Sequence, residues 1–240
     1  MTEYKYVYII KEMNFSIRAL RFLSIFNPKS TDFGRHLAYK NIPDQLDLRE
    51  TGFVGPVHDQ GRCNACWAFS AAGSIEFHVG KEVSVQNILD CSPGTYGCSG
   101  GLMGHVFEYY DAFPLKYEYG GEKHKCFPHH RGAHVKNYIA LEEDIENNLP
   151  FLLAQFGPVA VGVDFHRLKK YRGLVVEPSD CDKNPHHAAL VVGFTPNYWI
   201  IKNSMGVNWG DKGYAYLSRG KNTCGIGTTY ATVATEVEVT

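Results

Sequence analysis

The sequence lacks a long apolar run, a strong net charge and an internal repeat. No stretch approaches the roughly 20 apolar residues that a membrane-spanning helix needs. The formal net charge is -1, so the chain has no excess of cationic side chains of the kind that binds nucleic acid or an anionic membrane. Its 24 glycines follow no fixed period, which excludes a collagen-like chain. We therefore expect neither nucleic acid nor a membrane as a partner.

Disorder is excluded by what is present, because 44% of the 240 residues are hydrophobic and 13% are aromatic. A helix is predicted over Trp67–His78, where apolar residues lie on nearly all faces, and a short acidic helix over Leu141–Leu149. After Gly157 the sequence predicts short strands over residues 159–163, 188–194, 198–202 and 213–218. Helices followed by strands indicate an α+β fold with two lobes.

The first 41 residues differ from the remainder in charge. They contain seven Lys/Arg and three Asp/Glu, whereas residues 42–240 contain 17 Lys/Arg and 22 Asp/Glu. The main boundary is therefore placed at Asn41-Ile42-Pro43. No secretory signal is visible in the first segment, because Arg18 and Arg21 interrupt its longest apolar stretch.

Seven cysteines indicate three disulfides and one free thiol, and three disulfides imply an oxidising compartment. Two other interpretations remain open at this point. Cys63-x-x-Cys66 could form half of a zinc site or a redox pair. However, six residues separate Cys91 from Cys98 and no second closely spaced pair follows.

Three segments carry candidate catalytic groups. Cys66 stands where a loop enters the predicted helix, and the positive end of a helix favours the nucleophilic thiolate. His187 precedes a predicted strand and could act as the base, and Asn203 follows the next strand and could orient the imidazole. Each has an ordinary structural alternative: a half-cystine, a packed histidine and a turn residue.

Together these residues resemble the papain-like cysteine peptidases, most closely their cathepsin L-like branch. The similarity covers nearly all of residues 42–231. It rests on the segments Gln60-Gly61-x-Cys63-x-x-Cys66-Trp67-Ala68-Phe69-Ser70, Gln86-Asn87-x-Leu89-Asp90-Cys91, Cys98-Ser99-Gly100-Gly101-Leu102-Met103, His187-Ala188, Trp199-x-x-Lys202-Asn203-Ser204-x-Gly206-x-x-Trp209-Gly210-x-x-Gly213-Tyr214 and Cys224-Gly225-Ile226.

The resemblance implies an α+β, papain-like two-lobe fold. One lobe is helical (roughly residues 50–138) and the other is an antiparallel, barrel-like lobe (roughly residues 139–235), with the active-site cleft between them. Residues 42–240 form the peptidase domain, and residues 1–41 are expected to be a shortened or degenerate prosegment, with a misassigned start as the alternative. The implied disulfides are Cys63–Cys98, Cys91–Cys126 and Cys181–Cys224, which leave Cys66 free.

The resemblance also assigns roles. Cys66 is expected to be the nucleophile, His187 the base and acid, Asn203 the orienting group, and Gln60 the oxyanion-hole donor together with the backbone N–H of Cys66. Gly100 and Gly101 are expected to pair with an extended substrate. The residues expected to line the pocket for the second residue before the cut (P2) are Leu102, Met103, Ala188 and Thr229, all of them uncharged. Trp209 should form an apolar wall on the leaving-group side. An apolar P2 residue is therefore expected.

The implied partners are protein or peptide substrates and cystatin-like protein inhibitors, with the chain acting as a monomer in a lysosome or outside the cell. No cofactor and no metal are expected, and the histidines at 129, 130 and 134 are assigned to an exposed loop. Three features keep a silent homologue that binds peptides or partners open as an alternative. Met205 and Leu48 stand where the family usually has Trp, and the N-terminal segment departs from the family's long prosegment. At position 205 that Trp shields the Asn–His hydrogen bond.

Overall fold

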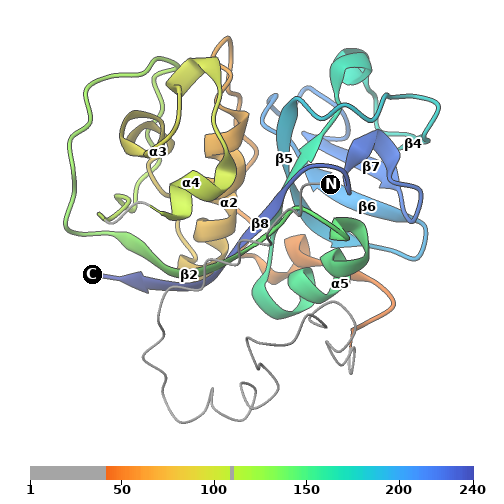
Figure 1. Cartoon of the computed structure of the whole chain (residues 1–240), viewed down its shortest axis with the longest axis horizontal. Helices are drawn as coiled ribbons and strands as arrows, with labels where there is room; N and C mark the ends of the chain where they lie inside the picture. Colours follow the sequence, from red (N-terminus) through yellow and green to blue (C-terminus); the bar gives the residue numbers. More distant parts are fainter. Residues whose placement is uncertain (1–41, 109–110) are drawn as a thin grey trace, which may run out of the picture.

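The computed structural model describes residues 42–108 and 111–240. The predicted prosegment, residues 1–41, lies outside the described residues. Helices α2, α3 and α4 gather on one side of the molecule and strands β5, β6 and β7 on the other (Figure 1). This arrangement confirms the predicted α+β fold with two lobes.

The helical lobe is built around α2 (Cys66–Val79), with α3 (Val85–Cys91), η2 (Gly97–Ser99) and α4 (Met103–Phe107) beside it. Nine of the 14 residues in α2 are buried, as the apolar pattern over Trp67–His78 predicts. Ser84 caps α3 by accepting a hydrogen bond from the Asn87 N–H, 3.0 Å away. The buried helix α2 therefore holds its first residue, Cys66, in a fixed place.

The strands of the described residues form one sheet in the order β2-β8-β3-β5-β6-β7-β4, and β1 pairs with β5. The pairs are antiparallel except β4 with β7, which is parallel. The strand bounds are β1 Leu46–Asp47, β2 Ala133–Leu141, β3 Val159–Val163, β4 Val175–Val176, β5 His187–Phe194, β6 Tyr198–Lys202, β7 Tyr214–Ser218 and β8 Ala231–Val239.

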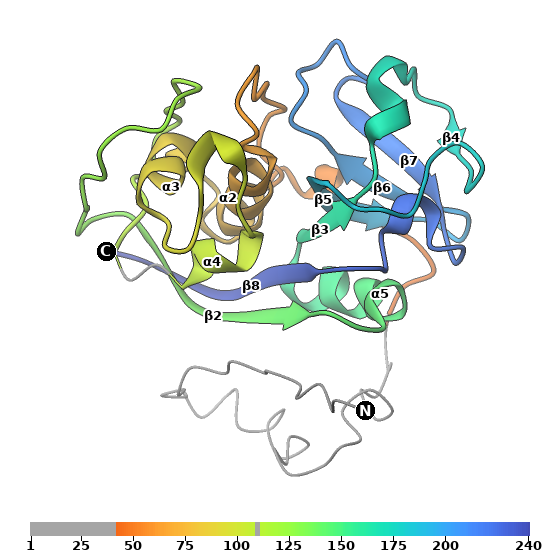
Figure 2. The ribbon, with the colours of Figure 1, turned by 45° about the horizontal axis from the view of Figure 1, so that its top comes forward.

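The long antiparallel pair β2–β8 runs from below the helical lobe toward α5, and so passes both lobes (Figure 2). The predicted helix over Leu141–Leu149 is wrong in its position. Residues up to Leu141 belong to β2, and α5 spans Ile145–Phe156. The acidic pair Glu142 and Glu143 is exposed between these elements. The helix lies further along because Leu149, Leu152 and Leu153 are the residues that enter the core.

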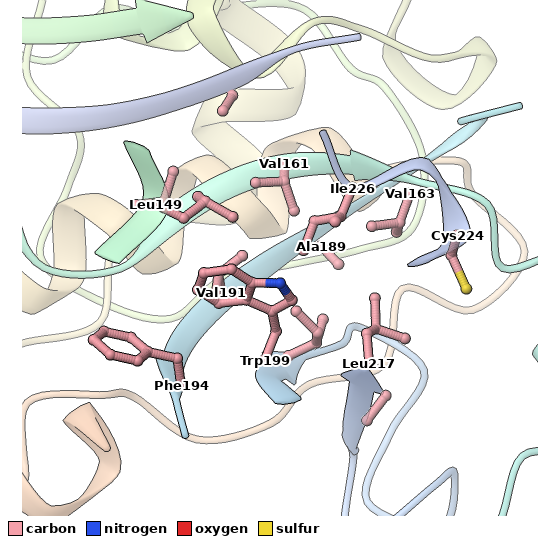
Figure 3. Packing of buried hydrophobic residues seen from close by; sticks show 14 of the residues in the cluster. Leu149, Val161, Val163, Ala189, Val191, Phe194, Trp199, Leu217, Cys224 and Ile226 are labelled. Atoms are coloured by element: carbon pink, nitrogen blue, oxygen red, sulfur yellow. The ribbon is translucent and has the colours of Figure 1, made fainter. Parts of the chain in front are cut away.

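The core of the second lobe surrounds Trp199 on β6, which is fully buried. Its indole lies among apolar side chains of β3, β5 and β7, including Val161, Val191 and Leu217 (Figure 3). The indole N–H donates to Glu146 Oε1 on α5, 2.9 Å away. Short 3-10 helices η1 (Leu48–Thr51), η3 (His166–Lys170) and η4 (Thr223–Gly225) complete the fold. In this lobe β5 and β6 each have a strand on both sides; β5 begins with the candidate residue His187, and the candidate residue Asn203 directly follows β6.

The structure contains three disulfides, Cys63–Cys98, Cys91–Cys126 and Cys181–Cys224, which are the pairs that the resemblance implies. Cys63–Cys98 links the loop before α2 to the Gly-rich loop that follows α3. Cys66 is the free cysteine. In residues 42–108 and 111–240, no helix has both the length and the apolar character needed to cross a bilayer.

Candidate active site

Cys66 is the first residue of α2, and its free thiol is partly exposed in a cleft between the lobes. The backbone N–H groups at the start of a helix have no partner within the helix, and they carry partial positive charge. The helix therefore presents a nucleophilic side chain where negative charge is stabilised.

His187 and Asn203 come together at the adjoining ends of two neighbouring strands. His187 is the first residue of β5, Asn203 directly follows β6, and the register Leu190↔Lys202 brings these ends together. The imidazole Nε2 lies 2.8 Å from Asn203 Oδ1, and both residues are buried. His187 lines the same cleft as Cys66.

The Asn203 amide has a defined orientation. Its Oδ1 also accepts a hydrogen bond from the Ser204 N–H, 2.9 Å away, so Oδ1 rather than Nδ2 must face His187. The imidazole therefore donates through Nε2–H, and Nδ1 is the nitrogen left with a free lone pair. The tautomer needed to take a proton from a thiol is the one that the structure stabilises.

Burial disfavours the charged form of both groups. Burial raises the pKa of the Cys66 thiol, and this effect exceeds the lowering by hydrogen bonds from the backbone N–H groups of Ala188, Trp67 and Cys66. Burial also lowers the pKa of the His187 imidazole, and this effect exceeds the increase that the hydrogen bond to Asn203 causes. The lowering of the thiol pKa expected at a helix start is therefore outweighed by desolvation. Transfer of the thiol proton to the imidazole would create both charges at once, and the two opposite charges would then attract each other.

Gln60 is held by three neighbours at the edge of the cleft. Its Oε1 accepts from the Ser204 hydroxyl at 2.6 Å, and its Nε2 donates to the Cys63 carbonyl at 2.9 Å. Its own carbonyl accepts from the Tyr119 hydroxyl at 2.7 Å. One of the two amide N–H bonds is thus engaged, and the other is available to a ligand. An amide that is held in place and keeps one N–H free has the donor that an oxyanion site requires.

The cleft has a volume of about 790 Å³, within the usual range for ligand sites. Gly100, at φ 121°, has nothing within 4 Å of where a Cβ would stand, so the backbone there is open to a ligand. At Gly101 a Cβ would lie 2.7 Å from the Trp67 ring, so only glycine fits. These two residues leave main-chain groups accessible along one wall.

Most of the predicted substrate-binding residues line this cleft, namely Gly100, Gly101, Leu102, Met103, Ala188 and Thr229. Trp209 is placed differently. It is buried behind Phe165, with ring centroids 5.7 Å apart, and donates to the Leu168 carbonyl. The cleft surface on that side is formed by Phe165 itself.

Two residues that line the cleft, Phe165 and Tyr230, were not predicted from the sequence. Phe165 lies shortly after β3, and Tyr230 directly precedes β8. Neither belongs to a motif, and no local signal marks them. Met205 departs from the family pattern in the sequence. In the structure it lines the cleft, and its backbone forms an isolated antiparallel β-bridge with Asp59.

The histidines assigned to an exposed loop, His129 and His130, are exposed, and His134 lies at the start of β2. Within the described residues, no group of three or more His, Cys, Asp or Glu side chains is arranged to hold a metal ion.

Comparison with known proteins agrees with this geometry. Residues 42–234 match the model of the papain family cysteine proteases. The chain belongs to the papain family. It is 38% identical to mouse (Mus musculus) cathepsin K over 210 residues, covering 77% of this chain and 63% of the relative. It is also 38% identical to mouse cathepsin S over 227 residues, covering 83% of this chain and 66% of the relative.

Solved structures of papain-family proteins share the fold. The digestive procathepsin L2 proteinase from Tenebrio molitor larval midgut aligns with a TM-score of 0.77 at 34% identity, covering 83% of this chain and 70% of that chain. Bromelain from Ananas comosus, in complex with the E64 inhibitor, aligns with a TM-score of 0.72 at 28% identity, covering 79% and 97%. The chain spans less than two thirds of the length of the cathepsin relatives.

Proposed function

We propose that the chain is a cysteine endopeptidase that hydrolyses peptide bonds through a thioester on Cys66. The observation that carries the proposal is the 2.8 Å contact between His187 Nε2 and Asn203 Oδ1, beside the free thiol of Cys66 in one cleft. A histidine held in this tautomer has its second nitrogen free for the thiol. Family membership supports the same chemistry.

In the proposed reaction the thiol proton moves to His187 Nδ1, and Cys66 Sγ attacks the carbonyl carbon of the substrate. The carbonyl oxygen gains negative charge and is stabilised by the free N–H of Gln60 and the backbone N–H of Cys66. The C–N bond then breaks, and the imidazolium gives its proton to the leaving amine. Water attacks the thioester, the imidazole takes a proton from it, and the acid leaves as the thiol re-forms.

The substrate is proposed to lie extended along Gly100 and Gly101, with an apolar P2 side chain among the uncharged residues Leu102, Met103, Ala188 and Thr229. A P2 arginine would find no carboxylate among these residues. Residues 42–240 are proposed as the peptidase domain and residues 1–41 as its shortened prosegment. Secretion or lysosomal location is part of the same proposal, supported by the cathepsin relatives. Action as a monomer and inhibition by cystatin-like proteins are proposed on the family resemblance alone.

A second candidate is a catalytically weak homologue that binds peptides in this cleft. It is favoured by Met205, which lines the cleft at the position where a shielding aromatic ring is usual in the family. Substrate turnover separates the two candidates.

The test is to incubate the full chain, with disulfides intact and at mildly acidic pH, with a peptidyl epoxide that alkylates activated cysteines. Mass spectrometry then maps the adduct, and turnover of quenched fluorescent peptides with Leu or Arg at P2 is measured in parallel. Cys66→Ala is the control for both measurements. We expect one adduct, on Cys66, and faster hydrolysis of the Leu peptide.

The outcomes separate the proposals. An adduct on Cys66 without peptide turnover supports the peptide-binding homologue. No adduct and no turnover by folded protein overturn the peptidase proposal. Turnover that persists in Cys66→Ala overturns the role of Cys66, and faster hydrolysis of the Arg peptide overturns the P2 assignment alone.

A further inference from the structure

The end of the cleft beside Trp209 is lined by side chains that carry or can carry positive charge. Lys169, His166 and His186 all line the cleft there and all are exposed; we name these three residues the cationic rim. His166 and Lys169 belong to η3, which Trp209 contacts through Phe165 and the Leu168 carbonyl. The family resemblance, which puts Trp209 on the leaving-group side, implies that the part of the substrate after the cut lies at this end, and the proposed function adopts this direction.

The members of the rim are held close together and have free polar atoms. The rings of His166 and His186 lie edge to face, 5.7 Å apart. His186 Nδ1 lies 3.1 Å from the Asn184 carbonyl and therefore donates to it, which leaves Nε2 free. Within the described residues, Lys169 has no ion-pair partner.

The carboxylates near the rim are already engaged. Asp164 is buried, accepts from the His166 and Asn184 N–H groups, and lies 3.5 Å from His186 Nδ1. Asp59, whose backbone pairs with that of Met205, also lines the cleft. Its carboxylate accepts a hydrogen bond from the Gly61 N–H, 2.8 Å away. Arg167, which also belongs to η3, forms an ion pair with Asp182. The buried Asp164 therefore helps to hold the rim residues in place, and its carboxylate does not fill the binding site that they would offer.

We propose that the cationic rim is a binding site for an acidic side chain of the substrate, at one of the first three residues after the cleaved bond. The inference rests on the proposed function, because that function sets the direction of the peptide. The carboxylate is attracted by the positive charge of Lys169, and it can accept hydrogen bonds from the side chains of the rim.

The test uses quenched fluorescent peptides with one common sequence that differ only at the three positions after the cut, where Glu, Gln or Lys is placed one position at a time. The kcat/KM of the full chain is measured at pH 5.5, because histidine side chains gain charge between pH 8 and 5. At the favoured position we expect kcat/KM for Glu to exceed that for Gln by about two- to fivefold, within the range of an exposed ion pair. Lys should be the poorest, and added salt should reduce the ratio.

The variant Lys169→Gln should bring the Glu-to-Gln ratio toward one. Lys170→Gln is the matched control, since Lys170 is exposed on the same helix but does not line the cleft; it should keep the ratio. Equal rates for Glu and Gln, or a ratio that survives Lys169→Gln, overturn the site while peptide hydrolysis itself upholds the proposed function. A chain that hydrolyses none of the peptides contradicts the proposed function, and the inference falls with it.

Discussion

The ring of Phe165 lies stacked on the imidazole of His187, with centroids 5.6 Å apart and planes 26° from parallel. Phe165 is buried, and its other neighbour is Trp209. The family usually shields the Asn–His hydrogen bond with a Trp at the position of Met205. In this chain Phe165 supplies an aromatic surface against the imidazole, and it limits both the rotation of the ring and the access of water.

Phe165→Leu is expected to lower kcat/KM by about tenfold, part of the 10²–10⁴ that a positioned acid or base contributes. Leucine stays apolar but cannot stack, so the imidazole loses orientation. The companion measurement is an NMR titration of His187 in a Cys66→Ala background. Phe165→Ala should raise the imidazole pKa toward its ordinary value, because burial is what lowers it. Phe53→Ala, at an exposed ring elsewhere, is the control. An unchanged titration and unchanged kinetics would show that the stack has no role in positioning.

Ser204→Ala is expected to lower kcat by about tenfold while KM changes little. The Ser204 hydroxyl fixes the Gln60 amide, and without it the free N–H no longer points at the developing oxyanion. A complete oxyanion donor contributes 10²–10³ in kcat, and a misaligned donor should lose part of this. The measurement is steady-state kinetics on the apolar P2 peptide.

The control is the same substitution in a Gln60→Ala background. If Ser204 acts through Gln60, Ser204→Ala has no further effect there, because the two residues are coupled. Additive losses would mean that Ser204 acts by another route, such as its N–H bond to Asn203.

The elements that sequence analysis located are those with strong local signals. The helix over Trp67–His78 has an apolar surface of its own, and the strand over residues 159–163 is buried at every position except Gly162. The pair β2–β8 was not predicted, because its partners are about 100 residues apart and its β2 strand is mostly half-exposed. Helix α5 was misplaced because Pro150 discourages a helix locally, although the packing of Leu149 and Leu153 keeps it.

The candidate site divides in the same way. Cys66, His187, Asn203 and Gln60 stand in recognisable segments, so family resemblance was enough to select them. Phe165 stands in an ordinary apolar sequence after β3, and its contact with His187 depends on how η3 packs on Trp209. Such a contact exists only in the folded chain, so no pattern in the sequence could indicate it.

Lys202→Met is expected to destabilise the protein by about 3–5 kcal/mol, the usual cost of leaving a buried charge unpaired. Lys202 and Glu76 are both buried between the lobes and attract each other. Burial lowers the pKa of Lys202 and raises that of Glu76, and each partner opposes the shift of the other. The free energy of unfolding in urea measures the loss.

The double variant Glu76→Gln/Lys202→Met should lose less stability than the sum of its single variants, because no charge is left alone. Lys221→Met is the surface control, since Lys221 and Glu177 form an exposed ion pair of 2.8 Å; it should cost less than about 1 kcal/mol. If Lys202→Met and Lys221→Met reduced the free energy of unfolding equally, burial would not be what makes the Glu76–Lys202 pair important for stability.

Acid is expected to destabilise the fold through His78, near the end of α2. Burial lowers the pKa of its imidazole, although the Ala234 carbonyl, 2.7 Å from Nε2, opposes the shift. The unfolded chain therefore binds a proton more readily than the folded protein does. The contribution of His78 is complete above the unfolded pKa of about 6.5 and is lost as the pH falls toward the lower folded pKa. The urea midpoint should thus decrease between pH 7.5 and pH 5.

His78→Gln isolates this contribution, because glutamine can still donate to the Ala234 carbonyl but does not titrate. The variant should lose less stability between pH 7.5 and pH 5 than the parent chain. His187, whose pKa burial also lowers, contributes with the same sign and remains in both proteins, so the difference between the two slopes belongs to His78. Parallel slopes for His78→Gln and the parent would mean that His78 is protonated equally easily in the folded and unfolded states.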